Sequence, residues 1–597
     1  MKSRFLQLFS FFNLSFLITY LIFIFYFLQI NIDKTNLLSI FYLLTIPLYY
    51  YFFLFIIFLA LSITAINRYL SYAYLFFKTI FDFYLLVNLL VFKTYNFHID
   101  LLFIEMFFND TEGMGVSWYA FATLITIFVL LFVANLYLFR VAKNRSFKSN
   151  IFLSVTLIIL LAINQIIHIW GSYYNQSYIT KYTPYFPLFY PTVSTRRVAK
   201  LEKQYPFLKP KNYKKKASNA IATKGVFHYP KHKIDINGSI KKPNILFITL
   251  ESWEAKEMNV ATTPHIYNFA KENINFLNHY SSGNVTTKGL FGLLYGLYAT
   301  QNYKAVLSDP IKYQTVFIKT LKSLGYDIGL YTTSDFSRFS LKDMFFGREN
   351  KNIYILKSGN VYKNDKNITN IVSNSINNGK KPWFKFVFLT SSHFNYHYPK
   401  SFEKFKPIAQ NTSTYLINKS VDPKPYINKY KNSLLYSDYL VNKILNRLKD
   451  KSLMDNTIVV ITADHAEEFA QTMHWGHGSC YNQYQLNVPL IIHMPNGNKN
   501  TIKRRTYHID IVPTILSYMG IKNSISDYSN GVDIFKDNIS RDMIFSNYIT
   551  KAYLVNDTIV TSGMMVKKYN IYNAKKEKKV DYKRLNKLKK AEVSFFN

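Results

Sequence analysis

Five long apolar segments restrict the first 170 residues of the chain to a bundle of membrane-spanning helices. The segments are Leu8–Ile30, Leu37–Thr64, Tyr69–Phe92, Val116–Phe139 and Ile151–Trp170. Each is long enough to cross about 30 Å of hydrocarbon as a helix. Lys2 and Arg4 precede the first segment, and no small-residue cleavage site follows it. We therefore interpret this segment as a retained helix and not as a signal peptide.

The charges between these segments predict their orientation. One set of loops and ends is basic and carries Lys2, Arg4, Arg68, Arg140, Lys143, Arg145 and Lys148. The opposite loops, Asn31–Asn36 and Lys93–Gly115, carry Asp33, Asp100, Glu105, Asp110 and Glu112. The positive-inside rule then places the N-terminus in the cytoplasm and everything after Trp170 outside. Lys78 and Asp82 lie four residues apart in the third segment, either as a functional intramembrane pair or as a neutralising salt bridge.

We expect three parts in the chain: a transmembrane domain at 1–170, a linker at 171–242 and an outer domain at 243–597. Prolines such as Pro184 exclude a long helix from the linker, which is also aromatic and basic. Arg196 and Arg197 in the linker are candidates for binding lipid phosphates at the outer membrane surface. A solvated tether explains the same composition, and the two interpretations stay open.

Short apolar runs alternate with amphipathic stretches in the outer domain. Asn244–Leu250, Ile328–Thr332, Trp383–Thr390, Thr457–Ala463 and Val488–Met494 are typical of buried strands, whereas Pro264–Asn273 and Tyr430–Asp450 are typical of helices. This alternation predicts an α/β fold with a mostly parallel sheet and helices on both faces.

Two of these strands end in side chains that suit a divalent metal ion. Glu251 follows the first strand, and Asp464 and His465 follow the fourth. Ligands in open α/β sheets bind beyond the carboxyl ends of the strands, so the three side chains are expected to meet there. Carboxylate and imidazole ligands suit one divalent ion, whether manganese, magnesium or zinc. A carboxylate that caps the next helix is the alternative for Glu251 alone.

A glycine-containing turn, Ser281–Asn284, leads into an apolar helix with Thr286 or Thr287 at its start. The free N–H groups of a helix N-terminus stabilise an anionic transition state, so this position suits a nucleophile that attacks phosphorus. A plain helix cap is the alternative. His393 and His477 follow and precede predicted strands, and either could donate to a phosphoryl oxygen.

The amino-acid composition excludes several other kinds of structure and partner. The single cysteine, Cys480, rules out an intramolecular disulfide and a thiolate-rich metal site. The 72 Lys and Arg against 35 Asp and Glu give a net charge of +37, which favours anionic partners. Because no nucleic-acid-binding motif is evident, membrane lipids are preferred over nucleic acid as the partner.

Together these features resemble the alkaline phosphatase/sulfatase superfamily and its membrane-anchored branch, which includes lipoteichoic acid synthases and phosphoethanolamine transferases. The YejM family of Gram-negative inner-membrane proteins, which touch lipopolysaccharide, is the most similar. The phrases that carry this resemblance are Ile167–Trp170, Tyr190–Arg197, Ser281–Asn284, Gly289–Gly296, Gln485–Pro495 and the stretch His508–Thr514 with Asp510. The resemblance implies that Glu251, Asp464 and His465 are metal ligands and that Thr286 is both a ligand and the nucleophile.

Other details narrow the activity. The Cys/Ser-x-Pro-x-Arg motif of true sulfatases is replaced by Thr286–Thr–Lys–Gly–Leu290, so sulfate-ester hydrolysis is not expected. Phosphoethanolamine transferases usually carry several disulfides, which one cysteine cannot form.

Two hypotheses about the function follow. The first is a metal-dependent phosphohydrolase or phosphotransferase acting on phospholipid or lipopolysaccharide-related substrates at the periplasmic surface of the inner membrane. The second is a lipid A sensor that signals through its helices to a protein partner in the membrane.

Overall fold

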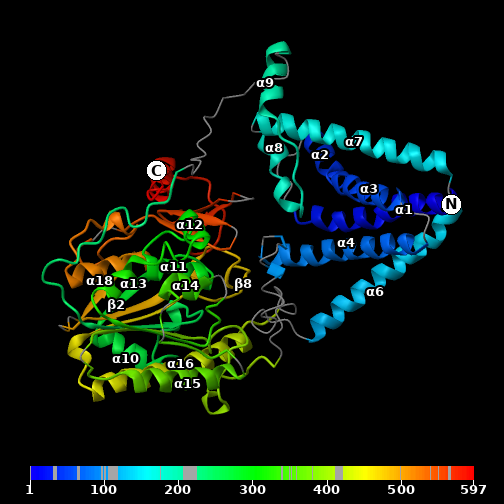
Figure 1. The fold of residues 1–597 in the computed structure, drawn as a ribbon. Coiled ribbons are helices and arrows are strands. Elements are labelled where there is room, and N and C mark those ends of the chain that lie inside the picture. The colour runs from blue at the N-terminus through cyan, green and yellow to red at the C-terminus, as the bar shows by residue number, and fades with distance from the viewer. Residues whose placement is uncertain are drawn as a thin grey trace. The chain divides into compact units, whose positions relative to one another are not determined.

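The structure is a computed structural model of two compact units, whose boundary in the chain falls between 220 and 221 (Figure 1). It describes residues 2–596 except 31–36, 64–67, 96–97, 100–102, 105–117, 145, 175, 206–224, 338–339, 349, 351, 358, 380, 411–420, 496, 498, 538–539, 549 and 563–565. Several predictions concern residues outside the described part. These are the acidic residues Asp33, Asp100, Glu105, Asp110 and Glu112, the basic Arg145, and the side chains of Lys2, Arg68 and Arg196.

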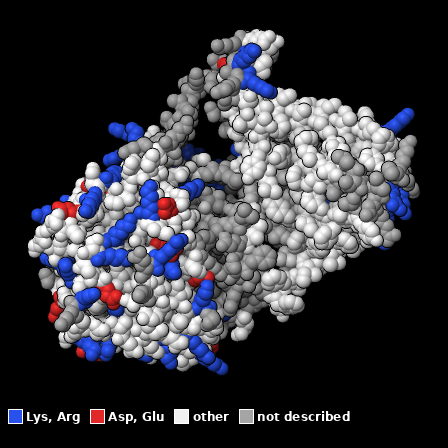
Figure 2. Space-filling model, in the orientation of Figure 1, with Lys and Arg blue, Asp and Glu red and all other residues white. Residues whose placement is uncertain are grey.

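The first unit is helical, and it contains five spans long and apolar enough to cross a membrane among the residues described. Its helices are α1 (Lys2–Phe27), α2 (Leu37–Thr45), α3 (Leu48–Ile63), α4 (Arg68–Tyr95), α6 (Trp118–Val141), α7 (Phe147–Tyr173), α8 (Ser177–Thr180) and α9 (Thr195–Gln204). The second predicted span is divided into α2 and α3 around Pro47, whose nitrogen has no hydrogen to donate to a helical bond. On the face shown in Figure 2, charged side chains gather at the ends of this unit and leave its flank uncharged.

Buried polar side chains join the helices of the bundle. Lys78 Nζ lies 2.5 Å from Asp82 Oδ2, so the predicted pair is a buried salt bridge within α4. Thr19 of α1 donates to Asp82 Oδ1 at 2.8 Å, and Asn135 of α6 donates to Asp82 Oδ2 at 3.3 Å. Because lipid offers no alternative partners, these bonds satisfy the charge inside the bundle and link three helices.

The second unit is built on a nine-stranded sheet with the order β10-β2-β9-β6-β1-β5-β3-β4, in which β11 also pairs with β2. Its strands are β1 (Asn244–Leu250), β2 (Ile274–Tyr280), β3 (Asp327–Thr332), β4 (Ile353–Ile355), β5 (Trp383–Leu389), β6 (Thr457–Ala463), β9 (Asn487–His493), β10 (Asn500–Ile502) and β11 (Thr506–Tyr507). β1 pairs in parallel with β5 and β6, and β3 pairs in parallel with β5, as predicted. β9 runs antiparallel to β2 and β6. The sheet is therefore mixed and mostly parallel.

Helices cover both faces of this sheet (Figure 1). One face packs against α11 (Thr286–Tyr295), α12 (Gln301–Ser308), α13 (Val316–Ser323), α14 (Leu341–Phe346) and α18 (Ile511–Met519). The other packs against α10 (Pro264–Glu272), α15 (Val361–Ser375) and α16 (Lys424–Asp450). Every residue of β1, β5 and β6 is buried, as expected for central strands that lie between two layers of helices.

Smaller elements complete the unit. A hairpin of β7 (Glu468–Phe469) and β8 (Trp475–Gly476) is followed by the short helix α17 (Gln483–Leu486). A four-stranded antiparallel sheet comprises β12 (Met543–Ser546), β13 (Lys551–Val555), β14 (Thr558–Ser562) and β15 (Lys568–Asn570), and α19 (Tyr582–Glu592) packs on it through Leu585 and Leu588. The predicted fold class is confirmed, while the predicted boundaries at 170 and 242 stay predictions.

Candidate active site

The register of β1 and β6 places two carboxylates at one edge of the sheet. These strands are parallel neighbours, and Leu250 pairs with Ala463, so the residue that follows each strand leaves the sheet at the same level. Those residues are Glu251 and Asp464, which are 3% and 0% exposed. The chain turns at Ser252 with φ of 56°, and the Ser252 backbone N–H donates to Asp464 Oδ1 at 3.0 Å. This bond fixes the Asp464 carboxylate beside Glu251.

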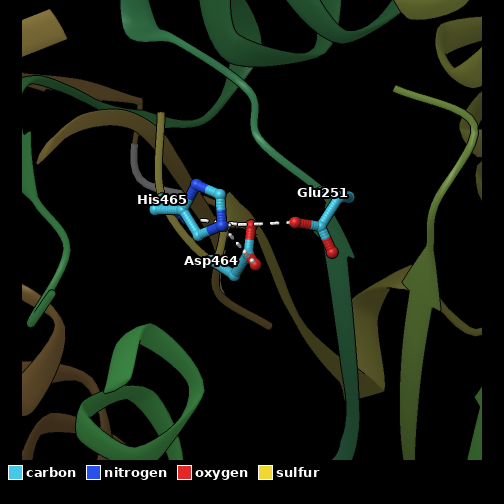
Figure 3. A group of neighbouring side chains, drawn as sticks. All are labelled: Glu251, Asp464 and His465. Carbon is cyan, nitrogen blue, oxygen red and sulfur yellow. Dashed lines mark hydrogen bonds and ion pairs between the residues drawn. The ribbon is translucent and has the colours of Figure 1, made fainter. Parts of the chain in front are cut away.

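His465 presents an unprotonated nitrogen to both carboxylates. Its Nδ1 lies 3.1 Å from the carbonyl oxygen of Ala466, which can only accept, so Nδ1 carries the proton of the neutral ring. The lone pair of Nε2 then lies 3.2 Å from Glu251 Oε1 and 3.3 Å from Asp464 Oδ2 (Figure 3). Asp464 Oδ2 is buried and accepts no hydrogen bond within the described part of the structure. Three atoms able to bind a cation therefore converge at one point.

The electrostatics of the cluster suit a bound cation. Burial, and then the neighbouring Glu251, raise the pKa of Asp464 to about 7. Burial lowers the pKa of His465 to about 4, although Asp464 acts in the opposite direction. A divalent cation would reverse the effect on the carboxylate, because an opposite charge nearby favours its ionised form.

The donor set fits one divalent metal ion. Ligand atoms of Glu251, Asp464 and His465 all lie within 4.8 Å of one another and are buried. Oxygen and nitrogen atoms that each lie about 2.1 Å from one ion are separated by about 3 to 3.4 Å. The distances from His465 Nε2 to the two carboxylates fall in this range. These residues would hold the ion, whose identity their chemistry leaves open.

Thr286 lies at the first position of α11, directly beside this cluster. Its Oγ1 donates to Glu251 Oε1 at 3.3 Å and lies 3.4 Å from His465 Nε2. Val285 occupies the N-cap position, so Thr286 does not cap the helix. The N–H groups of Lys288 and Gly289 donate to the Val285 carbonyl, whereas the first N–H groups of a helix have no partner within it and can bind an anion. Thr287, the alternative, is buried.

Gly289 allows α11 to approach the candidate metal ligands closely. A Cβ at this position would lie 2.0 Å from the backbone oxygen of Asp464. The Ser281 hydroxyl, from the turn before the helix, also donates to that oxygen. The start of α11 and the end of β6 are therefore held together by backbone contacts, and only glycine fits at position 289.

The two histidines predicted to bind phosphate, His393 and His477, are both half-buried beside the cluster. The His477 ring lies against the His465 ring, tilted by 38° with centroids 4.1 Å apart, and the His393 ring centroid lies 5.9 Å from that of His477. His477 Nδ1 donates to Glu467 Oε2 at 2.7 Å, and Glu467 also accepts from Tyr396 at 2.9 Å. Burial lowers the pKa of His477, but Glu467 outweighs this effect and the net shift is upward.

The C-terminal sheet supports the turn before Thr286. Gly283 forms a bridge with Ser546 at the end of β12, and the Ser546 N–H donates to the carbonyl of Ser282 at 3.2 Å. A Cβ at Gly283 would lie 2.2 Å from the Ser546 carbonyl oxygen, so glycine permits this contact. Asn547, the next residue, donates to Gly478 in the loop that carries His477, at 3.1 Å.

The two arginines predicted to bind lipid lie in the first unit, in α9. Arg197 is exposed there, next to the buried Val198, whereas the side chain of Arg196 lies outside the described residues. The same region is more structured than predicted. Ile179, Tyr182, Phe186 and Phe189, which precede α9, are buried against the helices of the bundle.

Two acidic residues near the site, Glu467 and Glu468, were not predicted from the sequence. Both are 0% exposed. They follow the candidate metal ligands in the run Asp464–His–Ala–Glu–Glu468, whose acidic residues are typical of a solvated loop. The signal that could have identified them is the wealth of polar residues in 471–485, which supplies their partners.

Comparison with known proteins agrees with this architecture. Residues 243–521 match the Sulfatase family, and residues 2–236 match a domain of unknown function, DUF3413. The inner membrane protein YejM of Salmonella typhimurium is 24% identical over 464 residues, which cover 76% of this chain and 72% of YejM. The similarity therefore includes both units.

Two further relatives are transferases or synthases by name. The lipoteichoic acid synthase-like protein YvgJ of Bacillus subtilis is 20% identical over 353 residues, 55% of this chain and 54% of YvgJ. The Kdo(2)-lipid A phosphoethanolamine 7''-transferase of Salmonella typhimurium is 24% identical over 233 residues, 35% of this chain and 39% of that protein. Residues 243–521 are therefore similar to the Sulfatase family, and over its greater length the chain resembles the membrane protein YejM.

Proposed function

We propose that this protein is a metal-dependent phosphoester hydrolase or phosphotransferase of the bacterial inner membrane, acting at the periplasmic surface on phospholipid or lipopolysaccharide-related substrates. One observation carries the proposal. The Thr286 hydroxyl lies 3.3 Å from Glu251 Oε1 and 3.4 Å from His465 Nε2, at the start of a helix and beside a metal-ligand set. A threonine hydroxyl becomes an effective nucleophile when a metal ion lowers its pKa.

In the proposed reaction, each residue of the site has a distinct role. Thr286 Oγ1 attacks phosphorus, the bond to the leaving oxygen breaks, and the phosphoryl group passes to water or to an acceptor hydroxyl. Glu251 accepts the hydrogen bond from Thr286 and orients it. The first N–H groups of α11 stabilise the charge on the phosphoryl oxygens. His477, oriented through Nδ1 by Glu467, and His393 donate to the substrate phosphate. The metal ion, when bound, supplies Lewis-acid activation of the hydroxyl.

The test is metal analysis of the purified full-length chain together with an assay of phosphodiester and phosphomonoester hydrolysis. We expect about one divalent ion per chain and turnover that a chelator abolishes and the ion restores. A chain that binds no metal ion and hydrolyses no phosphoester would contradict the proposal.

We further propose that the N-terminus is cytoplasmic and the second unit periplasmic. The basic residues that remain in the described part, such as Arg140 and Lys143, support this orientation. A reporter enzyme that works only after export is expected to be active when fused after Trp170 and inactive when fused within 143–148. The opposite pattern would contradict the orientation.

A second function, sensing of lipid A with little or no catalysis, is favoured by α9. This helix carries exposed Arg197 and Lys200, and a relative acts, by its name, on Kdo(2)-lipid A. A lipid bound there would be reported through the helices to a protein partner in the membrane.

Replacing both Arg196 and Arg197 with alanine is expected to weaken binding of lipid A vesicles by about thirtyfold while the melting temperature stays unchanged, because each cation near an anionic surface contributes about 1 kcal/mol. The measurement is vesicle co-sedimentation of the full-length protein. Unchanged binding would remove these residues from the sensor hypothesis.

A further inference from the structure

Glu468 is a fully buried carboxylate that accepts five hydrogen bonds. Its Oε1 accepts from the Thr472 N–H at 2.7 Å, the Thr472 hydroxyl at 2.7 Å and the His474 N–H at 3.4 Å. Its Oε2 accepts from Asn482 Nδ2 at 2.7 Å and Gln485 Nε2 at 2.9 Å. No Lys, Arg or His forms an ion pair with it among the residues that the structure describes. A buried charge that is satisfied only by neutral donors fixes all of them in place.

Gln485 connects Glu468 to the turn before Thr286 by hydrogen bonds. Its Oε1 accepts from the N–H groups of Ser479 and Cys480 at 3.2 and 3.0 Å, and from Asn284 Nδ2 at 3.0 Å. Because three donors surround this oxygen, the amide nitrogen of Gln485 is directed to the other side, where it donates to Glu468. Glu468, as the acceptor on that side, favours the same amide orientation, in which the Gln485 oxygen accepts from Asn284.

Asn284 joins the turn before Thr286 to the loop that carries His477. It is 0% exposed and lies two positions before Thr286, and its Nδ2 also donates to the Cys480 carbonyl at 3.0 Å. The loop that it binds carries His477. Gly478 of the same loop lies against Val285, where a Cβ would be 3.3 Å from Val285 Cγ1.

The segments Ser281–Asn284 and Gln485–Pro495 both contribute to the family resemblance, but the sequence assigns no chemical role to either. In the structure, Asn284 of the first segment donates a hydrogen bond to Gln485 of the second. A second link leads back to the metal ligands, because the Ala466 N–H, next to His465, donates to the Gln485 carbonyl at 3.2 Å.

We propose that Glu468, Gln485 and Asn284 are positioning residues that hold the Thr286 turn at a fixed distance from the loop of His477. None of the three touches the metal ligands through its side chain in the contacts described above. Their effect on rate rests on the proposed function, but their effect on the order of the two loops does not.

The test is an exchange of polarity between positions 468 and 485 in the full-length chain. Glu468→Gln puts an amide nitrogen where Gln485 Nε2 and Asn482 Nδ2 need an acceptor. Gln485→Glu keeps the acceptor for Asn284, Ser479 and Cys480 but places a second carboxylate beside Glu468. In the double variant, the amide introduced at position 468 donates to the carboxylate introduced at position 485, which still accepts from Asn284.

We expect each single variant to lower kcat by about tenfold to a hundredfold, with KM and metal affinity changed by less than about threefold. Hydrogen–deuterium exchange at the amides of Ser479 and Cys480 should become faster, since both bind Gln485. The double variant should recover kcat to within about threefold of the parent, a coupling that two independent defects would not show.

Asn284→Ala provides a test if the buried substitutions do not fold. It removes only the bonds to the turn, so kcat should fall while the amides of Ser479 and Cys480 stay protected. Parental kcat in this variant, or additive losses in the double variant, would overturn the proposal. If the parent itself shows no turnover, the proposed function fails, and the exchange data alone decide: unchanged exchange in Glu468→Gln would overturn the positioning role, and faster exchange that the double variant reverses would support it.

Discussion

Thr286→Ala is expected to lower turnover by at least about 1,000-fold, because it removes the oxygen that we propose attacks phosphorus. The structure gives this hydroxyl two contacts, with Glu251 Oε1 and His465 Nε2, at the start of α11. Metal affinity should fall by only about tenfold, since Glu251, Asp464 and His465 remain. The measurements are phosphoester hydrolysis and metal content of the full-length variant.

Two control variants isolate the hydroxyl. Thr286→Ser keeps the oxygen and should retain turnover within about tenfold of the parent, because only a methyl group is lost. Thr287→Ala removes the neighbouring hydroxyl, which is buried on another face of the helix, and should matter less than Thr286→Ala. Parental turnover in Thr286→Ala would show that this site is not catalytic.

Asp464→Asn is expected to remove the metal ion while the protein stays folded. Asp464 Oδ1 accepts from the N–H groups of Ser252 and His465, so these donors will hold the amide oxygen of the variant in the same place. The amide nitrogen then replaces Oδ2, 3.3 Å from His465 Nε2, and donates to the lone pair that would bind the ion. Metal affinity should fall by about 100-fold or more, and turnover should fall with it.

The measurement is metal content after dialysis against a weak chelator, with the melting temperature recorded in parallel. Asp438→Asn is the matched control. Asp438 is also buried, but it accepts from the backbone N–H groups of His265 and Ile266 at the start of α10, away from the metal ligands. The control should lose stability and keep its metal ion. Equal metal content in Asp464→Asn and the parent would contradict the predicted ligand set.

The fold class could be predicted because its main signals are local. The apolar runs before Glu251 and Asp464 contain only residues that the structure buries, and each ends where its strand ends. The direction of a strand is not a local property, however. Val488–Met494 reads as a buried strand in either direction, and only its partners β2 and β6 show that β9 is antiparallel.

The candidate site was predictable where a residue's place in an element determines its role. Strand ends identified Glu251, Asp464 and His465 as a set, and the structure brings them together. Whether Thr286 or Thr287 faces the set depends on the residue at which α11 begins, which sequence patterns locate only within a few positions. The roles of Glu467 and Glu468 depend on partners such as His477 and Gln485 in a folded loop, which no sequence period reveals.

The bridge between Gly283 and Ser546 has a consequence for the order in which the protein is made. All predicted metal ligands, Glu251, Thr286, Asp464 and His465, leave the ribosome before β12 does. The Thr286 turn lacks its Ser546 contact until the final strands have been synthesised and have docked. A nascent chain therefore contains every predicted metal ligand before the contacts that support the predicted nucleophile are complete, and the proposed chemistry requires the C-terminal sheet.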